Sequence, residues 1–382
     1  MLSWVEADTA RIRANITAFR DLVAPGTEIM VVVKANAYGH GLNMVAPVAA
    51  EGGNWLGVNC VDEASAITKL GIANRILILG HTIPAEAGIA VKNGYRQVLY
   101  RLDVAQALSN AAQNLNAAAH VHLKIETGTN RQGVAAADLE NFVRTILKLP
   151  GLKIEGAYTH FANIEDTLDP SFAQMQLDRF KEAMAVLDRL GVRPEHVHAA
   201  ATAGALLYPE TNFSMVRIGI GAYGIWPSRE TQLAARERGR QIALSPALTW
   251  KTRVAQIKKV GAGDYVGYGL SYQAGRPMLV AVLPVGYYDG YDRRLSNSGR
   301  VLVNGQAVPV IGRVAMNMTM IDVTDAAANV DDEVVLLGRQ GNAEIRAEEV
   351  AEKAGTIPYE VLSRINPLLP RLRGDVGTDS EF

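Results

Sequence analysis

The sequence contains a single cysteine, no long apolar run and almost no charge imbalance. Cys60 has no second thiol with which to form an internal disulfide or a thiolate zinc site, and we expect it to be a small core residue. No apolar run reaches the length of about 18 residues that spans a bilayer, and the first residues show no secretion signal, so we expect a soluble, cytoplasmic protein. A formal net charge of -1 without a run of Lys or Arg excludes the electrostatic signature of nucleic-acid binding and favours a small-molecule function.

A hydrophobic content of 48% and a charged content of 20% over 382 residues allow one large domain and a smaller one. In the first two thirds of the chain, short apolar runs alternate with helix-length amphipathic segments, which is typical of parallel strands joined by helices. Eight such units predict a (β/α)8 TIM-type barrel of the α/β class. An open doubly wound sheet is less favoured because no GxGxxG motif follows the first strand. The expected strands are 29–33, 55–59, 75–79, 97–100, 121–125, 153–160, 196–200 and 215–220, and the expected helices include 41–52, 61–70, 104–115, 136–148 and 171–190.

After about residue 238, short β-type segments separated by Gly, Asn and Asp turns replace this alternation. We therefore expect a barrel over residues 8–238 and a mostly β C-terminal domain over residues 239–370. Residues 1–7 form a strand-like segment that can join the second domain, and residues 371–382 form a polar tail that we expect to be poorly packed. The expected β segments are 250–260, 278–285, 300–304, 318–323 and 333–338, with one helix near 347–354.

Polar side chains on several expected strands point toward one common axis. Because side chains alternate along a strand, residues two apart share a face, which in a barrel is either the interior or the outside. Barrels of this type carry their chemistry at the carboxyl ends of the strands. One such residue is usually only a strand end, but several on different strands indicate a site. The interior polar residues predicted in this way are Lys34, His122, Lys124, Tyr158, His160, His196, His198 and Arg217.

The stretch VVVKANAYGHG at residues 31–41 delivers a single lysine, Lys34, into a loop of small residues. A lysine amine can form a Schiff base with a carbonyl, and pyridoxal phosphate is the common cofactor that uses one to stabilise a carbanion. The cofactor's phosphate needs an anion site, and barrels bind phosphate through backbone N–H groups near the last strands. Gly204 and residues 219–221 occupy such positions.

Motifs spread over nearly the whole chain resemble, taken together and in order, the alanine racemase family. The motifs are VVVKANAYGHG, HLKIETGTNRQG, the Thr-His-Phe at 159–161, MVRIGIGAYG, VGYGLSY, PVGYYDGY and GRVAMNM. The resemblance implies a barrel enzyme with pyridoxal 5'-phosphate and a C-terminal β domain. Its activity would interconvert L- and D-alanine, supplying or consuming D-alanine for peptidoglycan metabolism. The resemblance also implies a homodimer whose active sites each include residues of both chains.

The resemblance assigns the proton chemistry to two residues. Lys34 matches the lysine that holds the cofactor covalently and then serves as base on one face of the α-carbon, while Tyr268 of the partner subunit matches the acid/base on the other face. An unperturbed tyrosine has a pKa of about 10 and needs help near neutrality. The implied help is a hydrogen-bonded relay of Tyr268, His160 and Arg217. Arg217 also faces the pyridine nitrogen, where a guanidinium keeps its proton and so favours reprotonation at Cα over transamination.

Further positions match binding residues of the family. Arg131 would lie near the cofactor's phenolic oxygen and the substrate carboxylate, which Met316 would contact through its backbone N–H from the other chain. Two neighbouring cations, Lys124 and Arg131, are costly unless one is neutralised, and the family position implies carbamylation of Lys124. No metal is expected. The cofactor-binding positions are Lys34, Tyr38, His160, Thr202, Arg217, Gly219, Ile220 and Tyr359; the substrate-binding positions are Arg131, Met316, Asn317 and Tyr287; and Tyr272, Tyr287 and Arg313 belong to the substrate corridor.

Two positions depart from the family pattern. Asn317 stands where the family usually has Asp, which removes a negative charge beside the substrate and leaves a serine or broader small-amino-acid racemase open. Ala201 stands where an Asn usually precedes the phosphate-binding hydroxyl, which would weaken cofactor anchoring slightly. Neither change removes a proposed base.

Three other functions compete with this interpretation. A metal-dependent barrel hydrolase would use histidines and a carbamylated Lys124, but the first strand supplies Lys34 and the eighth Arg217, a cation that repels a metal. Related barrel decarboxylases would carry a Cys in the C-terminal domain, where this chain has none. Non-catalytic cofactor carriers resemble the barrel alone. The candidate metal-binding histidines are His120, His122, His160, His196 and His198.

Overall fold

The computed structural model describes residues 1–374, and the chain divides into two compact units. The larger unit comprises Ile12–Ala35 and Val45–Ser245. The smaller unit comprises Met1–Arg11, Asn36–Met44 and the described residues from Pro246 to Gly374. Each unit is therefore assembled from segments that are distant in the sequence.

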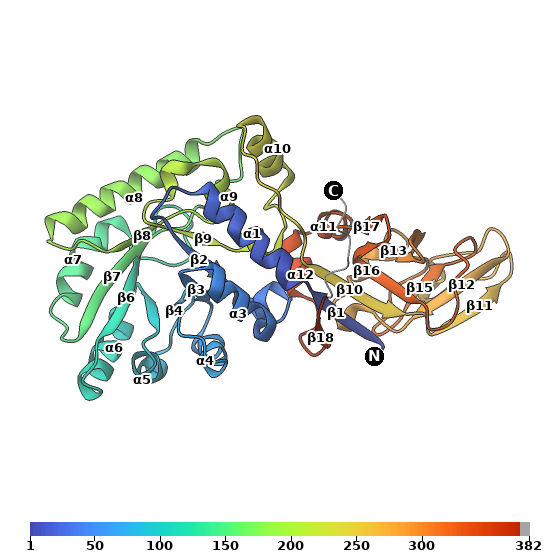
Figure 1. Ribbon diagram of the computed structural model, residues 1–382, viewed down its shortest axis with the longest axis horizontal. Helices are drawn as coiled ribbons and strands as arrows, with labels where there is room; N and C mark the ends of the chain where they lie inside the picture. The colour runs from blue at the N-terminus through green and yellow to red at the C-terminus, as the bar shows by residue number, and fades with distance from the viewer. Residues whose placement is uncertain (375–382) are drawn as a thin grey trace. The chain divides into compact units, whose positions relative to one another are not determined.

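Eight parallel strands form a nearly closed barrel in the larger unit (Figure 1). Their order is β8-β7-β6-β5-β4-β3-β2-β9. Backbone hydrogen bonds from Ser214 N to Val197 O (3.1 Å) and from Arg217 N to Ala200 O (3.0 Å) join the two ends of this sheet. The predicted TIM-type barrel is thus confirmed. The strands are β2 (Glu28–Val32), β3 (Trp55–Val58), β4 (Arg75–Ile78), β5 (Arg96–Leu99), β6 (Ala119–Lys124), β7 (Leu152–Tyr158), β8 (His196–His198) and β9 (Met215–Ile218).

Helices cover the outside of the barrel, and their sequence pattern explains why (Figure 1). In α7 (Ala136–Ile146), the buried residues Leu139, Phe142, Val143 and Ile146 recur at a spacing of three and four residues, which places them on one helix face. Four such side chains contribute roughly 6–12 kcal/mol of gross hydrophobic stabilisation. No helix in the described part of the chain is long and apolar enough to cross a membrane. The other helices are α1 (Thr9–Leu22), α3 (Leu42–Gly52), α4 (Val61–Lys69), α5 (Ala87–Lys92), α6 (Leu102–Asn114), α8 (Ser171–Arg189), α9 (Thr202–Leu207) and α10 (Arg229–Glu237).

The barrel interior is filled with side chains. Met30, Trp55, Leu77 and Met215, from four different strands, form one buried cluster. A barrel of this size holds a packed core and no pore, so functional side chains have to lie beyond such a layer, toward the carboxyl ends of the strands.

The smaller unit is mostly β, as predicted. Its main sheet has the order β14-β13-β16-β10-β1-β18, with β17 paired to β16, and a second sheet has the order β11-β12-β15. β1 pairs antiparallel with β10, so the N-terminal strand lies inside the main sheet of this unit. The strands are β1 (Ser3–Ala7), β10 (Leu248–Arg253), β11 (Gln256–Val260), β12 (Met278–Leu283), β13 (Arg300–Val303), β14 (Gln306–Pro309), β15 (Thr319–Asp322), β16 (Glu333–Gln340), β17 (Ala343–Ile345) and β18 (Arg371–Arg373), and the helices are α11 (Ala347–Ala354) and α12 (Pro358–Ser363).

The prediction of one β segment over residues 250–260 is wrong. The chain leaves the main sheet after β10 and enters the second sheet as β11. At the crossing, Val254 N donates to Asp332 O (3.0 Å) beside the main sheet, and Ala255 N donates to Val282 O (2.9 Å) on β12. Consecutive residues therefore bond to different sheets, and a continuous apolar pattern does not reveal this change.

The prediction of a poorly packed tail from residue 371 is also wrong at its start. Arg371–Arg373 form β18, which pairs in parallel with β1. The guanidinium of Arg371 also donates to the carbonyls of Asn366 (2.6 Å) and Leu369 (2.7 Å). A polar sequence is thus held by backbone pairing and by its own arginine. Residues 375–382 of that prediction lie outside the described residues.

Candidate active site

Lys34 follows β2 directly and is half-buried at the carboxyl end of that strand. The carboxylate of Glu63 accepts hydrogen bonds from the backbone N–H groups of Ala35 (2.7 Å) and Asn59 (2.6 Å), which fixes the start of the segment. Burial lowers the pKa of the Lys34 amine, and Arg131 lowers it further against the opposing effect of Glu63. A larger share of neutral amine makes Lys34 a better nucleophile toward a carbonyl group.

The segment after Lys34 is a left-handed helical turn, α2 (Lys34–Tyr38), where a loop was expected. Four consecutive residues, from Ala35 to Tyr38, have φ between 52° and 54°. Each non-glycine residue in this conformation costs roughly 1–2 kcal/mol. Local bonds offset part of this cost, because Asn36 accepts from Gly41 N at its backbone oxygen (2.9 Å) and from Leu42 N at its side chain (2.8 Å). Such strain concentrates at functional sites, which agrees with a role for this turn.

Arg217 on β9 is buried, and no carboxylate in the described part of the chain forms an ion pair with it. Its Nη1 donates to His198 Nδ1 (2.8 Å), and its Nη2 donates to the carbonyls of Thr159 and Ala199 (both 2.9 Å) and to His160 Nδ1 (3.3 Å). Burial lowers the pKa of Arg217 to about 10, which leaves it protonated near neutrality. These bonds use both terminal nitrogens. The Nε–H has no acceptor among the described residues and is available to a bound group.

His160 is a neutral imidazole with a defined tautomer. Burial lowers its pKa well below the usual value, and the cations of Arg217 and Lys124 lower it further. Because a guanidinium only donates, His160 Nδ1 is the acceptor in its bond with Arg217. The single ring proton is therefore on Nε2. His160 receives a hydrogen bond on one side and can donate one on the other.

Lys124, at the end of β6, is a buried amine with no hydrogen-bond partner among the described residues. Its Nζ lies 4.7 Å from the centroid of the Tyr158 ring, and Arg217 Cζ lies 5.1 Å from the same centroid. Burial lowers the pKa of Lys124 well below its usual value, and the charges of Arg217 and Arg131 lower it further against Glu126. A neutral, unsatisfied amine beside cations is what the predicted carbamylation requires. The carbamylation itself stays a prediction.

Arg131 lies in a loop that Glu126 organises, and its side chain is exposed. Burial opposes ionisation of Glu126, but hydrogen bonds from backbone N–H groups, chiefly those of Asn130 and Gly128, lower its pKa. The Gly128 bond is 2.6 Å long. Through its Oε1 this carboxylate holds the loop that carries Arg131, whereas its buried Oε2 has no hydrogen-bond partner among the described residues.

Thr202 and the residues after β9 form a compact group of donors. Thr202 Oγ1 accepts hydrogen bonds from Gly219 N (3.2 Å) and Gly221 N (3.4 Å), which leaves its own hydroxyl proton to donate. A Cβ at residue 221 would lie 2.6 Å from the ring of Phe19, so glycine is needed for this close approach. Ile220 is buried within the same turn. Small residues and N–H groups in this arrangement suit a phosphate.

These side chains fit pyridoxal phosphate. Lys34 supplies an amine for the aldehyde, and Arg217 supplies an unused N–H for the ring nitrogen. Thr202 and the turn after β9 supply hydrogen-bond donors for the phosphate. Within residues 1–374, neither Lys34, Lys124 nor Arg217 has a carboxylate within ion-pair distance. An anionic cofactor and a substrate carboxylate would neutralise the positive charge of Arg217 and of the nearby Arg131.

In the smaller unit, two predicted phosphate-site tyrosines lie together. The ring centroids of Tyr38 and Tyr359 are 6.2 Å apart. Burial raises the pKa of Tyr38 to about 12, so its hydroxyl stays protonated and can donate a hydrogen bond to an anion.

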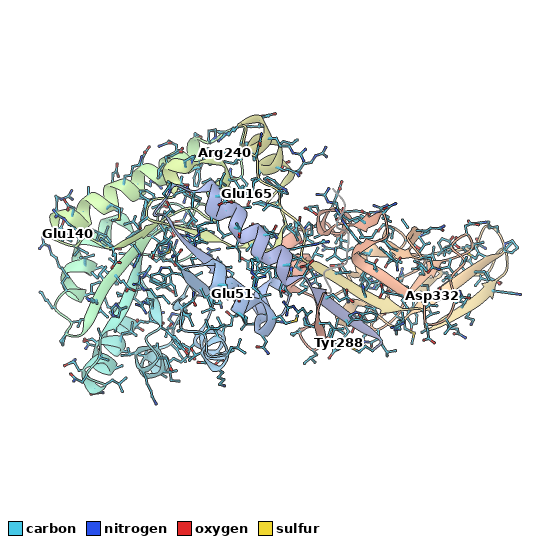
Figure 2. The ribbon with its side chains drawn as sticks, in the orientation of Figure 1. Glu51, Glu140, Glu165, Arg240, Tyr288 and Asp332 are labelled. Atoms are coloured by element: carbon cyan, nitrogen blue, oxygen red, sulfur yellow. The ribbon has the colours of Figure 1, made fainter. Side chains whose placement is uncertain are left out.

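The remaining predicted residues lie on exposed loops of the smaller unit. Tyr268 begins a short 3-10 turn and is 72% exposed. Backbone bonds from Tyr287 N to Ala315 O (3.1 Å) and from Tyr288 N to Met316 O (2.9 Å) hold two other exposed loops side by side, and Figure 2 labels Tyr288. Tyr272 instead packs partly buried against the core of the second sheet. The exposed predicted residues are Tyr268, Tyr287, Arg313, Met316 and Asn317.

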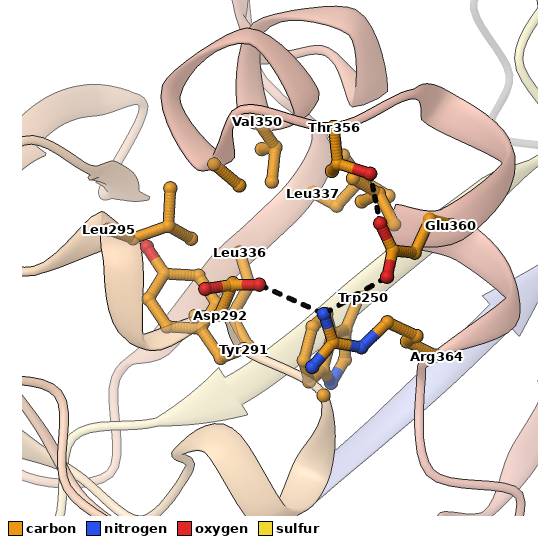
Figure 3. Close-up of a pocket in the computed structure, with 13 residues that line it drawn as sticks. Trp250, Tyr291, Asp292, Leu295, Leu336, Leu337, Val350, Thr356, Glu360 and Arg364 are labelled. Carbon is orange, nitrogen blue, oxygen red and sulfur yellow. Dashed lines mark hydrogen bonds and ion pairs between the residues drawn. The ribbon is translucent and has the colours of Figure 1, made fainter.

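A small cavity in the smaller unit is separate from all these residues (Figure 3). It measures about 20 Å³, which is room for about one water molecule. Trp250 and Tyr291 line it, and Arg364 at its edge bonds to Asp292 (3.0 Å) and Glu360 (3.4 Å). No predicted site residue lines this cavity, and it is too small for an amino acid.

The histidines considered as metal ligands have protein partners instead. His122 Nδ1 and His198 Nε2 are 2.9 Å apart, and His196 Nδ1 lies 2.8 Å from a carboxylate oxygen of Glu28. Among the described residues, no three His, Cys, Asp or Glu side chains are grouped so as to hold a metal ion.

Two further residues of this site had no role predicted from the sequence, although Tyr158 was predicted to face the barrel interior. Glu63 holds the turn after Lys34, and its only signal is an acidic residue in the first turn of α4. Tyr158 lies between Lys124 and Arg217, and its signal was the shared face with His160. Neither pattern is specific enough to assign a role without the fold.

Comparison with known protein families gives two matches. Residues 7–227 match the model of the alanine racemase N-terminal domain, and residues 247–373 match the model of the alanine racemase C-terminal domain. Alanine racemase of Symbiobacterium thermophilum is 41% identical over 374 residues, which cover 97% of this chain and 97% of that protein. Alanine racemase of Syntrophobacter fumaroxidans is 43% identical over 365 residues, covering 95% of each chain.

Solved structures of alanine racemases are also similar. The Bacillus anthracis enzyme with bound L-Ala-P has a TM-score of 0.92 and 35% identity, covering 99% of this chain and 96% of that one. The Bartonella henselae enzyme with covalently bound pyridoxal phosphate has a TM-score of 0.84 and 27% identity, covering 98% of this chain and 100% of that one.

Proposed function

Because this chain belongs to the alanine racemase family, we propose that it interconverts L- and D-alanine with pyridoxal 5'-phosphate as its cofactor. One observation supports this proposal most strongly. Lys34, His160 and Arg217 all come from the carboxyl ends of barrel strands, and each is set up for the role that racemisation needs. The amine of Lys34 has a lowered pKa, the imidazole of His160 is neutral, and Arg217 keeps a spare N–H.

The cofactor, when bound, supplies an electron sink that makes the Cα–H of the substrate acidic. Lys34 would hold it covalently, and the Nε–H of Arg217 would donate to its ring nitrogen. The Thr202 hydroxyl and the N–H of Ile220 would bind its phosphate, together with the N–H of Gly219, which would exchange its bond to Thr202 for one to the phosphate. Tyr38 and Tyr359 are proposed as phosphate ligands on the resemblance alone. Because the guanidinium of Arg217 keeps its proton, the ring nitrogen would remain unprotonated and would draw less electron density away from Cα. This would favour reprotonation at Cα over transamination.

Two bases act on opposite faces of Cα. With cofactor and substrate bound, the Lys34 amine would hold or remove a proton on one face of Cα. Tyr268 of the partner subunit serves the other face. His160 Nε2–H can donate to the phenolic oxygen of that tyrosine, which would favour the deprotonated form that acts as a base. The chain of donors is then Arg217 to His160 to Tyr268.

A homodimer explains why Tyr268 is exposed in one chain. The loops around it carry seven large apolar or aromatic side chains that are more than a third exposed, an unusual number for neighbouring loops on a soluble surface. A second copy of the chain is the partner that the two-base mechanism requires. The seven residues are Tyr265, Tyr268, Leu270, Tyr287, Tyr288, Met316 and Met318.

Substrate binding is assigned to residues of both chains. Arg131 pairs with the substrate carboxylate, and Met316, Asn317 and Tyr287 of the partner subunit complete the substrate pocket. CO₂ adds to the neutral amine of Lys124, forming an N–C bond and releasing one proton, and the resulting carbamate supplies the negative charge that Arg131 lacks.

Asn317 keeps a second substrate open. It is exposed and uncharged at a position where the family usually has Asp, so serine or another small amino acid is the alternative substrate. Cytoplasmic location, a role in peptidoglycan metabolism and the physiological direction stay predictions.

The test is to supply the purified protein with pyridoxal phosphate and to incubate it in deuterated water with L-alanine or, separately, L-serine. The expected result is D-alanine that carries deuterium at Cα, and the ratio of alanine to serine turnover measures the effect of Asn317. Covalently bound cofactor without α-deuterium uptake from either substrate would contradict the proposed activity while leaving the fold and cofactor assignment intact.

A further inference from the structure

Two hydrogen bonds and one electrostatic contact link four side chains in the barrel interior behind Arg217. Arg217 Nη1 lies 2.8 Å from His198 Nδ1, and His198 Nε2 lies 2.9 Å from His122 Nδ1. His122 Nε2 then faces a carboxylate oxygen of Glu155 at 3.7 Å, a contact of a ring N–H with a charge. The four side chains come from β9, β8, β6 and β7. This series of contacts therefore runs through the barrel interior from Glu155 to Arg217 at the proposed cofactor site.

The groups at the two ends of this chain determine which ring nitrogens of the two histidines carry a proton. Arg217 at one end can only donate. At the other end, the two hydrogen bonds from Arg96 (2.8 and 3.0 Å) and the nearby ring of His122 lower the pKa of the Glu155 carboxyl against the effect of burial, so Glu155 is ionised and can only accept. Burial lowers the pKa of His122 to about 4 and that of His198 well below its usual value, which makes both rings neutral near pH 7.

A neutral ring carries one proton, and only one arrangement satisfies all partners. His198 Nδ1 accepts from Arg217, so its proton is on Nε2 and is donated to His122 Nδ1. The proton of His122 is then on Nε2 as well, facing Glu155. Both hydrogen bonds point the same way, from the guanidinium to His122, and the N–H of His122 faces the negative charge of Glu155 at 3.7 Å. Hydrogen bonds aligned in this manner polarise and strengthen one another.

Packing prevents the rings from turning out of this arrangement. The Tyr158 ring stacks on His198 with centroids 4.7 Å apart and planes at 5°, and Trp55 meets His122 edge-on at 5.3 Å. The ring of His122 lies directly on the backbone of Gly156, where a Cβ would collide with it. The two histidines are therefore held in position as well as in protonation state.

We propose that His198, His122 and Glu155 are positioning residues that hold Arg217 for the racemisation reaction through this polarised chain. The proposal rests on the proposed function, because the role it gives these residues is to hold Arg217 so that its Nε–H faces the ring nitrogen of the cofactor. His198 Nδ1 is the acceptor that keeps the guanidinium in its plane, and Glu155 strengthens that acceptor through two rings. Loss of the chain would let Arg217 shift from the ring nitrogen of the cofactor, which should favour transamination over return of the proton to Cα.

Two substitutions of similar size separate positioning from simple packing. In His122→Asn, the side-chain oxygen can take the place of Nδ1 as acceptor for His198; in His122→Leu, no acceptor remains. Glu155→Gln removes the charge at the end of the chain. Glu28→Gln is the matched control, because Glu28 also pairs with an interior histidine, His196 (2.8 Å), that does not contact Arg217.

The first readout is ¹⁵N NMR of the seven histidines in the cofactor-free protein, where the shifts distinguish protonated from unprotonated ring nitrogens. For His198 we expect a proton on Nε2 in wild type, in His122→Asn and in His122→Leu, because Arg217 can only donate to Nδ1. The second readout, with cofactor, is the ratio of transamination to racemisation. Loss of the hydrogen bond between two neutral rings is expected to raise it about fivefold in His122→Leu, and loss of the charge of Glu155 about threefold in Glu155→Gln, but the ratio should rise less than about twofold in His122→Asn and Glu28→Gln.

A proton on Nδ1 of His198 in wild type, or equal ratios in His122→Leu and His122→Asn, would overturn the proposal. Failure of the wild type to racemise alanine would instead contradict the proposed function, and the NMR readout distinguishes this case because it needs no activity.

Discussion

The buried histidines make the stability of this protein depend on pH, and the contribution of His122 can be measured separately by replacing it. His122 has a pKa of about 4 in the folded chain, whereas an unfolded histidine has a pKa of about 6.5. Between these values the unfolded state binds a proton that the folded state does not. Stability therefore falls as the pH drops through 6.5, and this contribution levels off below pH 4. From pH 7 to pH 5, His122 alone should cost about 2 kcal/mol. His160 and His198 act in the same direction, because their pKa values are also lowered.

The measurement is urea unfolding of wild type and His122→Asn at pH 7 and pH 5, at equal protein concentration. The substitution also removes packing, so the informative quantity is the loss of stability between the two pH values, which should be smaller by about 2 kcal/mol in the variant. His81→Gln, at an exposed histidine, is the control and should lose as much as wild type. Equal losses in wild type and His122→Asn would show that His122 is not neutral in the folded chain.

Three further predictions concern the proposed active site. Lys34→Ala should abolish the visible absorbance of covalently bound cofactor, and a protein that still binds the cofactor covalently would contradict the assignment of Lys34. Tyr268→Phe should slow Cα–H exchange from one enantiomer more than from the other, measured by deuterium uptake from L- and D-alanine; equal slowing would argue against two separate bases. Gly221→Ala should weaken cofactor binding and cost about 1–3 kcal/mol of stability, because its Cβ would lie 2.6 Å from Phe19 and 2.7 Å from Thr202. Gly88→Ala, in helix α5 with open space around it, should leave cofactor binding unchanged and stabilise the protein by up to about 1 kcal/mol.

The barrel could be predicted from the sequence because its strands and helices carry strong local patterns. The expected strand 55–59 is β3 (Trp55–Val58), and the expected helix 171–190 is α8 (Ser171–Arg189). The amphipathic spacing of helices such as α7 decides these elements locally. By contrast, the change of sheet at Val254 and Ala255 depends on partners that are distant in the sequence, and no local pattern marks it.

The site was predictable to the extent that strand faces decide which side chains meet. Period-2 spacing placed His122, His198 and Arg217 in one interior, and they do contact one another. The roles of the histidines were not predictable, because an imidazole suits a metal, an acid/base role or a neutral hydrogen bond equally well until its partners are known. The left-handed turn after Lys34 was also missed, since Ala, Asn and Tyr rarely adopt this conformation and only long-range contacts can impose it.

The most direct test of the central claim, that each active site takes Lys34 from one chain and Tyr268 from another, is to mix two inactive variants. Lys34→Ala and Tyr268→Phe are unfolded together and refolded, so that their chains reassort into dimers. If the two bases come from different chains, each mixed dimer regains one intact site, and random pairing restores about a quarter of the wild-type activity. If both bases belong to one chain, every site in every dimer lacks one of them. No recovery of activity, despite mixed dimers, would contradict the account.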